Sequence, residues 1–314
     1  MIHEWEDAFS EALHIPHVSC DQMDFGNQKY GQSNLHLIFI PVAGQIKEYL
    51  SYPQLIPVVM DLWAHDIPEF IPYIIKFKFF FVTSLEAFLA LKSIGIQHVA
   101  YLPYSVPDIY VTNSVPHKDL DIIQFGRTNP LLDSYMKIFL NKFPETNYVT
   151  TRHHNNSIYF HSTRDGMLFE SNSRQRFMDM LSRSTISLVS TAGMDGSRET
   201  GGYNTVSPRF YESIAGCCRL IGRFPHSEEF AALGVDAIAE RVDSYEEFEW
   251  LLLKYIGKPF DQFGQYLEYL SKNTTSQRVP LIVNALDKLH GLRANLLSAV
   301  RCDTVRTDEL LFCQ

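Results

Sequence analysis

Short apolar runs alternate with segments of helical periodicity along most of the chain. In the first third, the apolar runs predict buried strands and the periodic segments between them predict helices, which is the pattern of parallel α/β layers. The first part of the chain is therefore predicted to form a small Rossmann-like domain. Its strands are predicted at 35–40, 55–60, 79–82 and 99–102, and its helices at 5–13, 43–49, 68–76 and 84–94.

The same alternation resumes after a proline-containing stretch. Residues 103–119 carry three prolines and little periodicity, so we place a boundary there, with a first domain over 1–110 and a second over 111–314. The predicted fold class is α/β with two Rossmann-like domains, the first of them short, and the terminal helices are allowed to pack back on it. The second series has predicted strands at 121–125, 147–150, 185–189 and 219–222, and predicted helices at 130–143, 173–182, 208–215, 245–255, 261–270 and, as one or two, 279–300.

Composition narrows the class of protein. A chain of 314 residues with 46% hydrophobic residues can bury two cores. The net charge of −9 argues against nonspecific nucleic-acid binding, which needs clustered cations. The first residues lack the basic start and apolar core of a signal peptide, and the five cysteines show no metal-ligand spacing. We therefore expect a cytoplasmic protein that binds no nucleic acid.

The segment from 190 to 224 carries most of the chemistry. It passes from a strand through a loop rich in glycine and hydroxyls into a helix at Ser207-Pro208, where serine can cap and proline suits the first turn. Such a helix start favours phosphate. Arg209 and Glu212 share one helix face, where the guanidinium matches phosphate oxygens and the carboxylate can accept from ribose hydroxyls. A solvated surface ion pair is the alternative.

The run Pro-Arg-Phe-Tyr-Glu-Ser-Ile-Ala-Gly at 208–216 resembles the R-x-x-E-x-x-A-x-G element of group-1 glycosyltransferases, especially their spore-maturation-protein-like branch. The resemblance implies a GT-B fold, with two domains facing across a cleft, and it implies that Glu212 holds the ribose of a nucleotide-sugar. A further glutamate of the family, which is implied to contact the donor sugar, is replaced here by Asn204. The same loop is expected to reach the sugar or diphosphate through Gly202, Tyr203, Asn204, Thr205, Val206 and Ser207.

A second anchor is the turn Phe-Gly-Arg-Thr at 125–128, which resembles the family's strand-Gly-Arg turn beneath the diphosphate. Arg127 is then expected to neutralise phosphate, and Gly126 and Thr128 to line the site. Many members of the family carry a lysine a few residues later, and this chain has none there. The second cation remains open between Arg152, Arg198 and Arg209.

His65 and Asp66 follow a predicted strand, at the carboxyl edge where ligands bind in open α/β sheets. His65 is expected to face the cleft, unless it packs near Trp63, and Asp66 is either a site residue or a helix cap. No metal site is expected at His153, His154 and His161, because adjacent histidines diverge and no carboxylate follows at ligand spacing. The loop from Arg152 to Phe160 is expected near the base or on the surface.

The expected function is transfer of a sugar from a UDP- or GDP-linked donor to a glycan or lipid-linked acceptor. The leaving diphosphate is to be stabilised by Arg127, Arg209 and the helix start, without metal or organic cofactor. The resemblance favours retention; with inversion, His65 or Asp66 is the base. A sugar-nucleotide epimerase or hydrolase, and a noncatalytic binding subunit, are the alternatives. The short first domain allows a partner subunit or homo-oligomer.

The aromatic run at 77–81 has two interpretations. It could contact the inner face of the membrane, because lipid-linked acceptors are common in the family. A buried strand is the favoured interpretation, since strands of parallel sheets read as continuous apolar runs.

Overall fold

The computed structural model describes residues 2–19, 35–52, 54–154, 157–171, 173–196, 200–288 and 296–301. These residues form two compact α/β units. The first unit contains the chain up to Asp108, residues 200–205, and the chain from Asn273 onward, whereas the second contains 109–196 and 206–272. The division at 110/111 predicted from the sequence therefore differs from the structure for residues 200–205, whereas the helix at Thr275–Asp287 belongs to the first unit, as the allowance for terminal helices that pack back on it anticipated.

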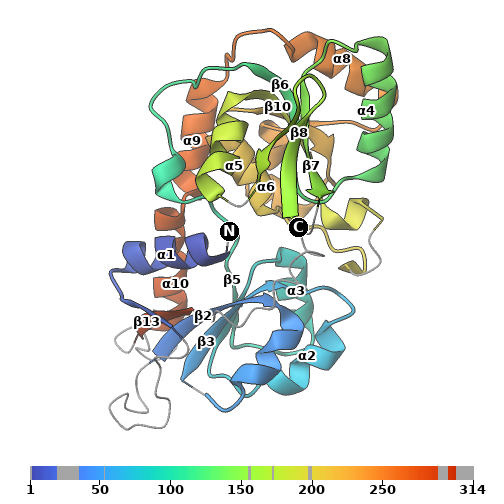
Figure 1. Ribbon diagram of the computed structural model, residues 1–314. Coiled ribbons are helices and arrows are strands. Elements are labelled where there is room, and N and C mark those ends of the chain that lie inside the picture. Colours follow the sequence, from blue (N-terminus) through green and yellow to red (C-terminus); the bar gives the residue numbers. More distant parts are fainter. Residues whose placement is uncertain are drawn as a thin grey trace. The chain divides into compact units, whose positions relative to one another are not determined.

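The first unit is built on a six-stranded sheet in the order β1-β13-β2-β3-β4-β5. All of its neighbouring strands pair in parallel. The sheet has buried strands near its centre, and Figure 1 shows β2 and β3 side by side. The strands are β1 (His17–Ser19), β2 (Leu35–Val42), β3 (Leu55–Asp61), β4 (Phe80–Val82), β5 (Val99–Tyr101) and β13 (Leu296–Arg301).

The helices of the first unit follow the predicted order closely. They are α1 (Ile2–Leu13), the 3-10 helix η2 (Ala43–Tyr49), α2 (Ile67–Ile74), α3 (Leu85–Ser93) and α10 (Thr275–Asp287), with η3 (Asp108–Tyr110) at the passage to the second unit. The aromatic run at 77–81 is buried at Phe77 and at all three phenylalanines from Phe79 to Phe81. The interpretation as a buried strand is therefore confirmed, because these rings lie in the core.

The prediction of helix through residue 300 is wrong from residue 296 onward. Residues 296–301 form β13, which lies between β1 and β2 and pairs Ala299 with Leu37 and Val300 with Ile38. The run Leu-Leu-Ser-Ala-Val has local preference for either structure, and pairing with two strands distant in sequence decides it.

The second unit contains a seven-stranded sheet in the order β12-β11-β10-β6-β7-β8-β9. The strands from β12 to β7 are parallel, and β8 and β9 extend the sheet antiparallel. The predicted loop from Arg152 to Phe160 is thus wrong, because cross-strand pairing makes it part of a hairpin. The strands are β6 (Leu120–Gln124), β7 (Tyr148–His154), β8 (Ser157–Ser162), β9 (Gly166–Glu170), β10 (Ser184–Ser190), β11 (Arg219–Arg223) and β12 (Glu240–Arg241).

Helices cover both faces of this sheet. Ile186 and Leu188 of β10 share a core with α4 and α8, whereas Ser187 between them bonds to Ser213 of α6, so α6 lies on the opposite face (Figure 1). The two-unit α/β fold predicted from the sequence is confirmed. The helices are α4 (Pro130–Lys142), α5 (Arg174–Arg183), α6 (Pro208–Ala215), α7 (Glu228–Ala232), α8 (Tyr245–Tyr255) and α9 (Phe263–Asn273), with short 3-10 turns η4 (Ala192–Met194) and η6 (Val235–Ala237).

The chain order creates a switch point in the second sheet. From β6 the chain passes through α4 to β7 on one side, and from β10 it passes through α6 to β11 on the other. Because β6 and β10 are neighbours, the connections after their carboxyl ends lead to opposite sides of the sheet, and open α/β sheets typically bind ligands at such a switch point. The predicted Gly-Arg turn and the start of α6 both lie at this edge.

Candidate functional site

Gly126 and Arg209 are in direct contact. Gly126 follows β6 with a φ of +67°, and a Cβ placed there would lie 2.6 Å from Nη2 of Arg209. Nη1 of Arg209 donates to the carbonyl oxygen of Arg127 at 2.9 Å. The structure therefore joins the two segments that the sequence singled out separately, and only glycine leaves room for the guanidinium.

The start of α6 carries an uncommitted hydroxyl. Ser207 is the N-cap residue, but its side chain accepts no hydrogen bond from the first turn, so the predicted side-chain cap is wrong. The N–H of Phe210 bonds instead to the Ser207 carbonyl oxygen at 3.1 Å. Oγ of Ser207 is buried without a hydrogen-bond partner. Val206, by contrast, is buried, and its N–H donates to Glu229 Oε1 at 3.3 Å.

Glu212 is only 2% exposed, so it is not part of a solvated surface pair. Its Oε1 accepts from Nη2 of Arg174 at 2.5 Å, while its Oε2 is buried without a partner. Arg174 is the first residue of α5 and was missed by sequence reasoning, since nothing local links it to Glu212 38 residues away. A charged carboxylate is stable at this depth only when it is paired, and Arg174 provides the pairing.

Asn129 ties together the loops that follow β6 and β10. Its side chain is fully buried and caps α4 by accepting from the N–H groups of Leu131 and Leu132 at 3.0 and 3.1 Å. Its Nδ2 donates to the Met194 carbonyl oxygen at 3.0 Å and to Asp195 Oδ1 at 2.8 Å. The Asn-Pro pair is a recognisable helix start. Its long-range contacts have no signal in the sequence.

Four buried polar atoms at this edge lack hydrogen-bond partners. Buried polar groups are normally paired, and each unpaired one costs about 1–3 kcal/mol, so a concentration of them indicates a ligand site. Here they include a guanidinium nitrogen, a hydroxyl and two carboxylate oxygens, which match the phosphates and hydroxyls of a nucleotide. They are Arg127 Nη1, Asp195 Oδ2, Ser207 Oγ and Glu212 Oε2. Thr128, in the same turn, is exposed.

Residues 202–205 belong to the first unit, not to the second as the sequence suggested. The N–H of Asn204 donates to Glu86 Oε2 at 2.5 Å, and Oγ1 of Thr205 donates to the Thr83 carbonyl oxygen at 3.3 Å. Tyr203 packs against the core of that unit, and the Asn204 amide donates to the Gly202 carbonyl oxygen at 2.7 Å. These groups hold the segment in place, and their role toward a donor stays a prediction.

His65 and Asp66 lie in the loop after β3 and contact each other. His65 Nε2 is 3.1 Å from Asp66 Oδ1, and the histidine side chain is 52% exposed. Asp66 stands at the N-cap position of α2 without a capping bond, and its Oδ2 accepts instead from the Trp63 N–H at 3.2 Å. The N–H of Ala64 bonds to the Thr200 carbonyl oxygen at 3.4 Å, which places this loop beside residues 200–205.

Of the remaining cation and metal candidates, Arg152 and His161 lie in the hairpin formed by β7 and β8. Arg152 is exposed in β7, and Arg198 lies outside the described residues. His161 lies in β8, while the side chains of His153 and His154 are outside the described part of the chain. Within the residues that the structure describes, no three His, Cys, Asp or Glu side chains come together as metal ligands.

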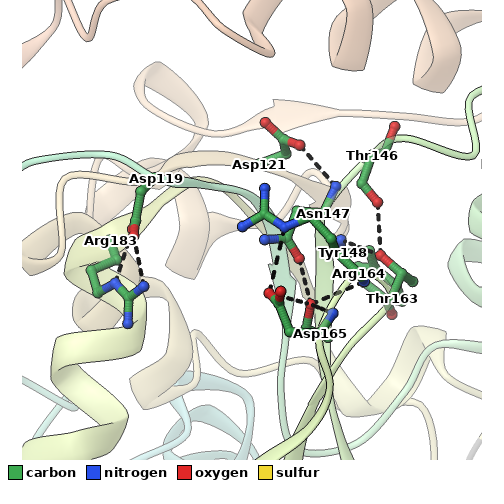
Figure 2. Close-up of polar contacts among 10 residues, drawn as sticks. Asp119, Asp121, Thr146, Asn147, Tyr148, Thr163, Arg164, Asp165 and Arg183 are labelled. Carbon is green, nitrogen blue, oxygen red and sulfur yellow. Dashed lines mark hydrogen bonds and ion pairs between the residues drawn. The ribbon is translucent and has the colours of Figure 1, made fainter.

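The chain contains an Asp-x-Asp triplet, Asp119-Leu-Asp121, which the prediction of a metal-free site did not take into account. It lies at the amino end of β6, opposite the Gly126-Arg127 turn. Figure 2 shows how its carboxylates are used: Asp119 accepts two hydrogen bonds from Arg183 at 2.9 and 2.6 Å, and Asp121 accepts from the Asn147 N–H at 2.8 Å. Both serve the framework at the edge away from the candidate site.

Two other expectations concern membranes and cysteines. In the described ranges, every helix is too short or too polar to cross a bilayer. Cys217 and Cys218 are buried free thiols, and Cys20, Cys302 and Cys313 lie outside the described residues.

No family model matches the sequence, and no curated protein matches it significantly. Among solved structures, the UDP-GlcNAc 2-epimerase of Methanocaldococcus jannaschii, in complex with UDP-GlcNAc and UDP, is 12% identical over 89% of this chain and 88% of its own, with a TM-score of 0.45. A putative UDP-N-acetylglucosamine 2-epimerase from Listeria monocytogenes is 10% identical over 82% and 74%, also at 0.45. A chain of the GtfA/B complex is 12% identical over 78% of this chain at 0.45, and this chain spans 54% of its length.

Proposed function

We propose that the second unit binds a nucleoside-diphosphate sugar at the carboxyl ends of β6 and β10, and that the protein is a glycosyltransferase. The observation that carries the proposal is the packing of Arg209 on Gly126, beside Arg127 and the start of α6. Two guanidinium groups and a helix N-terminus at one edge of the sheet suit the charge and geometry of a diphosphate.

Glu212 is proposed to bind the ribose. It lies about one helical turn, or roughly 5 Å, from Arg209 along α6, a separation that suits the distance between the ribose and the diphosphate of one nucleotide. Its unpartnered Oε2 can accept a hydrogen bond from a ribose hydroxyl.

In the proposed reaction, the bond between the anomeric carbon and the diphosphate breaks and a bond to an acceptor hydroxyl oxygen forms. The charge that develops on the leaving phosphate is stabilised by Arg127, Arg209 and the start of α6. With retention, as the sequence resemblance favours, the hydroxyl proton passes to the departing phosphate oxygen. With inversion, the exposed His65 or its partner Asp66 takes it. The acceptor is proposed to be a glycan or lipid-linked sugar.

Binding comes first among the tests. Wild type, Glu212→Gln and the control Glu228→Gln, which removes the same charge from an exposed position on α7, are titrated calorimetrically with UDP, GDP, ADP and CMP. We expect at least one nucleoside diphosphate to bind wild type and the control equally, and Glu212→Gln about tenfold or more weakly, as loss of a charged hydrogen bond requires. Wild type that binds no nucleotide overturns the proposal.

Product analysis then separates the kinds of activity. The protein is incubated with the matching nucleotide-sugars, with and without acceptor glycans, and the products are identified by NMR. A new glycosidic linkage supports the proposal. Free sugar alone indicates a hydrolase, an altered configuration in the intact nucleotide-sugar indicates an epimerase, and binding without turnover indicates a binding subunit; each contradicts transfer.

A further inference from the structure

Arg174 is held from two sides at the first position of α5. Its Nη2 donates to Glu212 Oε1 at 2.5 Å, and its guanidinium lies 4.7 Å from the ring centroid of Phe177 and 5.8 Å from that of Tyr110. Phe177 in turn meets Phe125 edge-on at 4.6 Å, directly before the Gly126 turn. The arginine is therefore fixed in orientation by its carboxylate partner and by aromatic rings.

This contact determines how Glu212 can act. A carboxylate is planar, so a hydrogen bond that fixes one oxygen also fixes the direction of the other. Oε1 is taken by Arg174, and Oε2 is buried without a partner. The Arg174 side chain is 22% exposed, whereas that of Glu212 is 2% exposed, so the guanidinium neutralises the carboxylate where water does not reach it.

We propose that Arg174 is a positioning residue for ribose recognition: by holding Oε1 of Glu212 it aims Oε2 at a ribose hydroxyl. The inference rests on the proposed function, because it assumes that a nucleotide occupies this site. A simple clamp between α5 and α6 would require no uncommitted oxygen. A clamp would also make no distinction between ribose and deoxyribose, and this difference provides the test.

The experiment measures ribose preference by calorimetry with UDP, GDP and their 2′-deoxy and 3′-deoxy analogues. The proteins are wild type, Arg174→Met, Arg174→Lys, Glu212→Gln and the Arg174→Met/Glu212→Gln double variant. The control is Arg183→Met, which breaks the exposed pair with Asp119 at the other end of α5 (Figure 2). Thermal unfolding of each variant establishes that it is folded.

We expect wild type and Arg183→Met to prefer the ribonucleotide about tenfold over at least one deoxy analogue. Arg174→Met is expected to lose this preference by weakening ribonucleotide binding, with little change for the deoxy form. Arg174→Lys restores part of it, because the charge remains but the planar fork is lost. The double variant is expected to bind the ribonucleotide no more weakly than Glu212→Gln alone, since both substitutions remove the same interaction with the ribose.

Two results overturn the inference alone: an Arg174→Met variant that keeps the wild-type ribose preference, or one that weakens ribo- and deoxynucleotides equally. If Arg174→Met does not fold, the folded Arg174→Lys variant provides the test. If Arg174→Lys keeps the full preference for ribonucleotides while Glu212→Gln loses it, a positioning role that needs the planar guanidinium is contradicted. Wild type that binds neither UDP nor GDP overturns the proposed function, and the inference with it.

Discussion

At the scale of single residues, the side chains of the candidate site are held in fixed positions by their contacts. Gly126 provides space for the Arg209 guanidinium, and Arg174 occupies one oxygen of Glu212. Asn129 uses its amide oxygen for a helix cap and its amide nitrogen for the neighbouring loop. The unpartnered atoms beside them are therefore held in place before any ligand arrives, which is the condition for tight binding of a polar ligand.

Gly126→Ala tests the contact with Arg209. The new Cβ would lie 2.6 Å from Nη2 of Arg209, so the guanidinium must move, and the φ of +67° adds strain for any other residue. We expect unfolding free energy to fall by about 1–2 kcal/mol, and nucleotide affinity to fall as well, as measured by urea denaturation and calorimetry. The control is Gly166→Ala, with a φ of +73° and open space around its Cβ, which should cost stability without affecting affinity. Equal nucleotide affinity in wild type and Gly126→Ala would contradict this role of Arg209.

At the scale of elements, the site is made by helix starts that gather at one edge of the second sheet. The helices α4, α5 and α6 each contribute a residue at or near their first turn, namely Asn129, Arg174 and Ser207. Local signals explain the helix starts, because Asn129 caps α4, Ser173 caps α5, and Pro208 suits the first position of α6. Their convergence follows from the parallel order of β6 and β10, which no local signal contains.

Asn129→Ala tests the link between the two loops. It removes the cap of α4 together with both hydrogen bonds to the loop after β10. We expect a loss of about 1–2 kcal/mol of unfolding free energy from the cap, and in addition weaker nucleotide binding because Asp195 is released. Ser244→Ala, which removes the cap of α8 away from the site, should lose similar stability and keep its affinity. Equal nucleotide affinity in Asn129→Ala and Ser244→Ala would show that the hydrogen bonds of Asn129 to the loop after β10 contribute to stability alone.

At the scale of the whole molecule, the chain divides its predicted binding loop between two units. Residues 200–205 belong to the first unit through Glu86 and Thr83, and the chain enters the second at Val206.

Burial raises the pKa of Glu86, an effect that the Asn204 N–H partly offsets. Burial lowers the pKa of His36 and of His98, so both are neutral in the folded protein near pH 7.

The lowered histidine pKa values predict loss of stability in acid. A histidine with a folded pKa below its unfolded value of about 6.5 stabilises the protein fully above that pH, and this contribution is lost as pH falls toward the folded pKa. The raised pKa of Glu86 acts in the opposite direction, since its cost is relieved in acid. We expect melting temperature to fall between pH 7 and pH 5, and to fall less in His98→Gln. An identical pH profile in that variant would contradict the assignment to His98.

The sequence alone predicted most of the local elements and the two segments that the structure brings into contact at the candidate site. Periodicity located most of the helices and strands, because it reflects which face each element buries. The Gly-Arg turn and the start of α6 were found because glycine, proline and charge have meaning over a few residues. These signals sufficed to predict an α/β protein and a phosphate site in its second half.

Only the tertiary structure decided what depends on residues distant in sequence. The pairing of β13 with β1 and β2 made a strand of a segment predicted as helix. The same holds for the Arg174–Glu212 pair and for the division of the chain between Thr205 and Val206. Each arises from contacts made once the sheets are assembled, and the free energy of those contacts exceeds the weak local preferences that a sequence reveals.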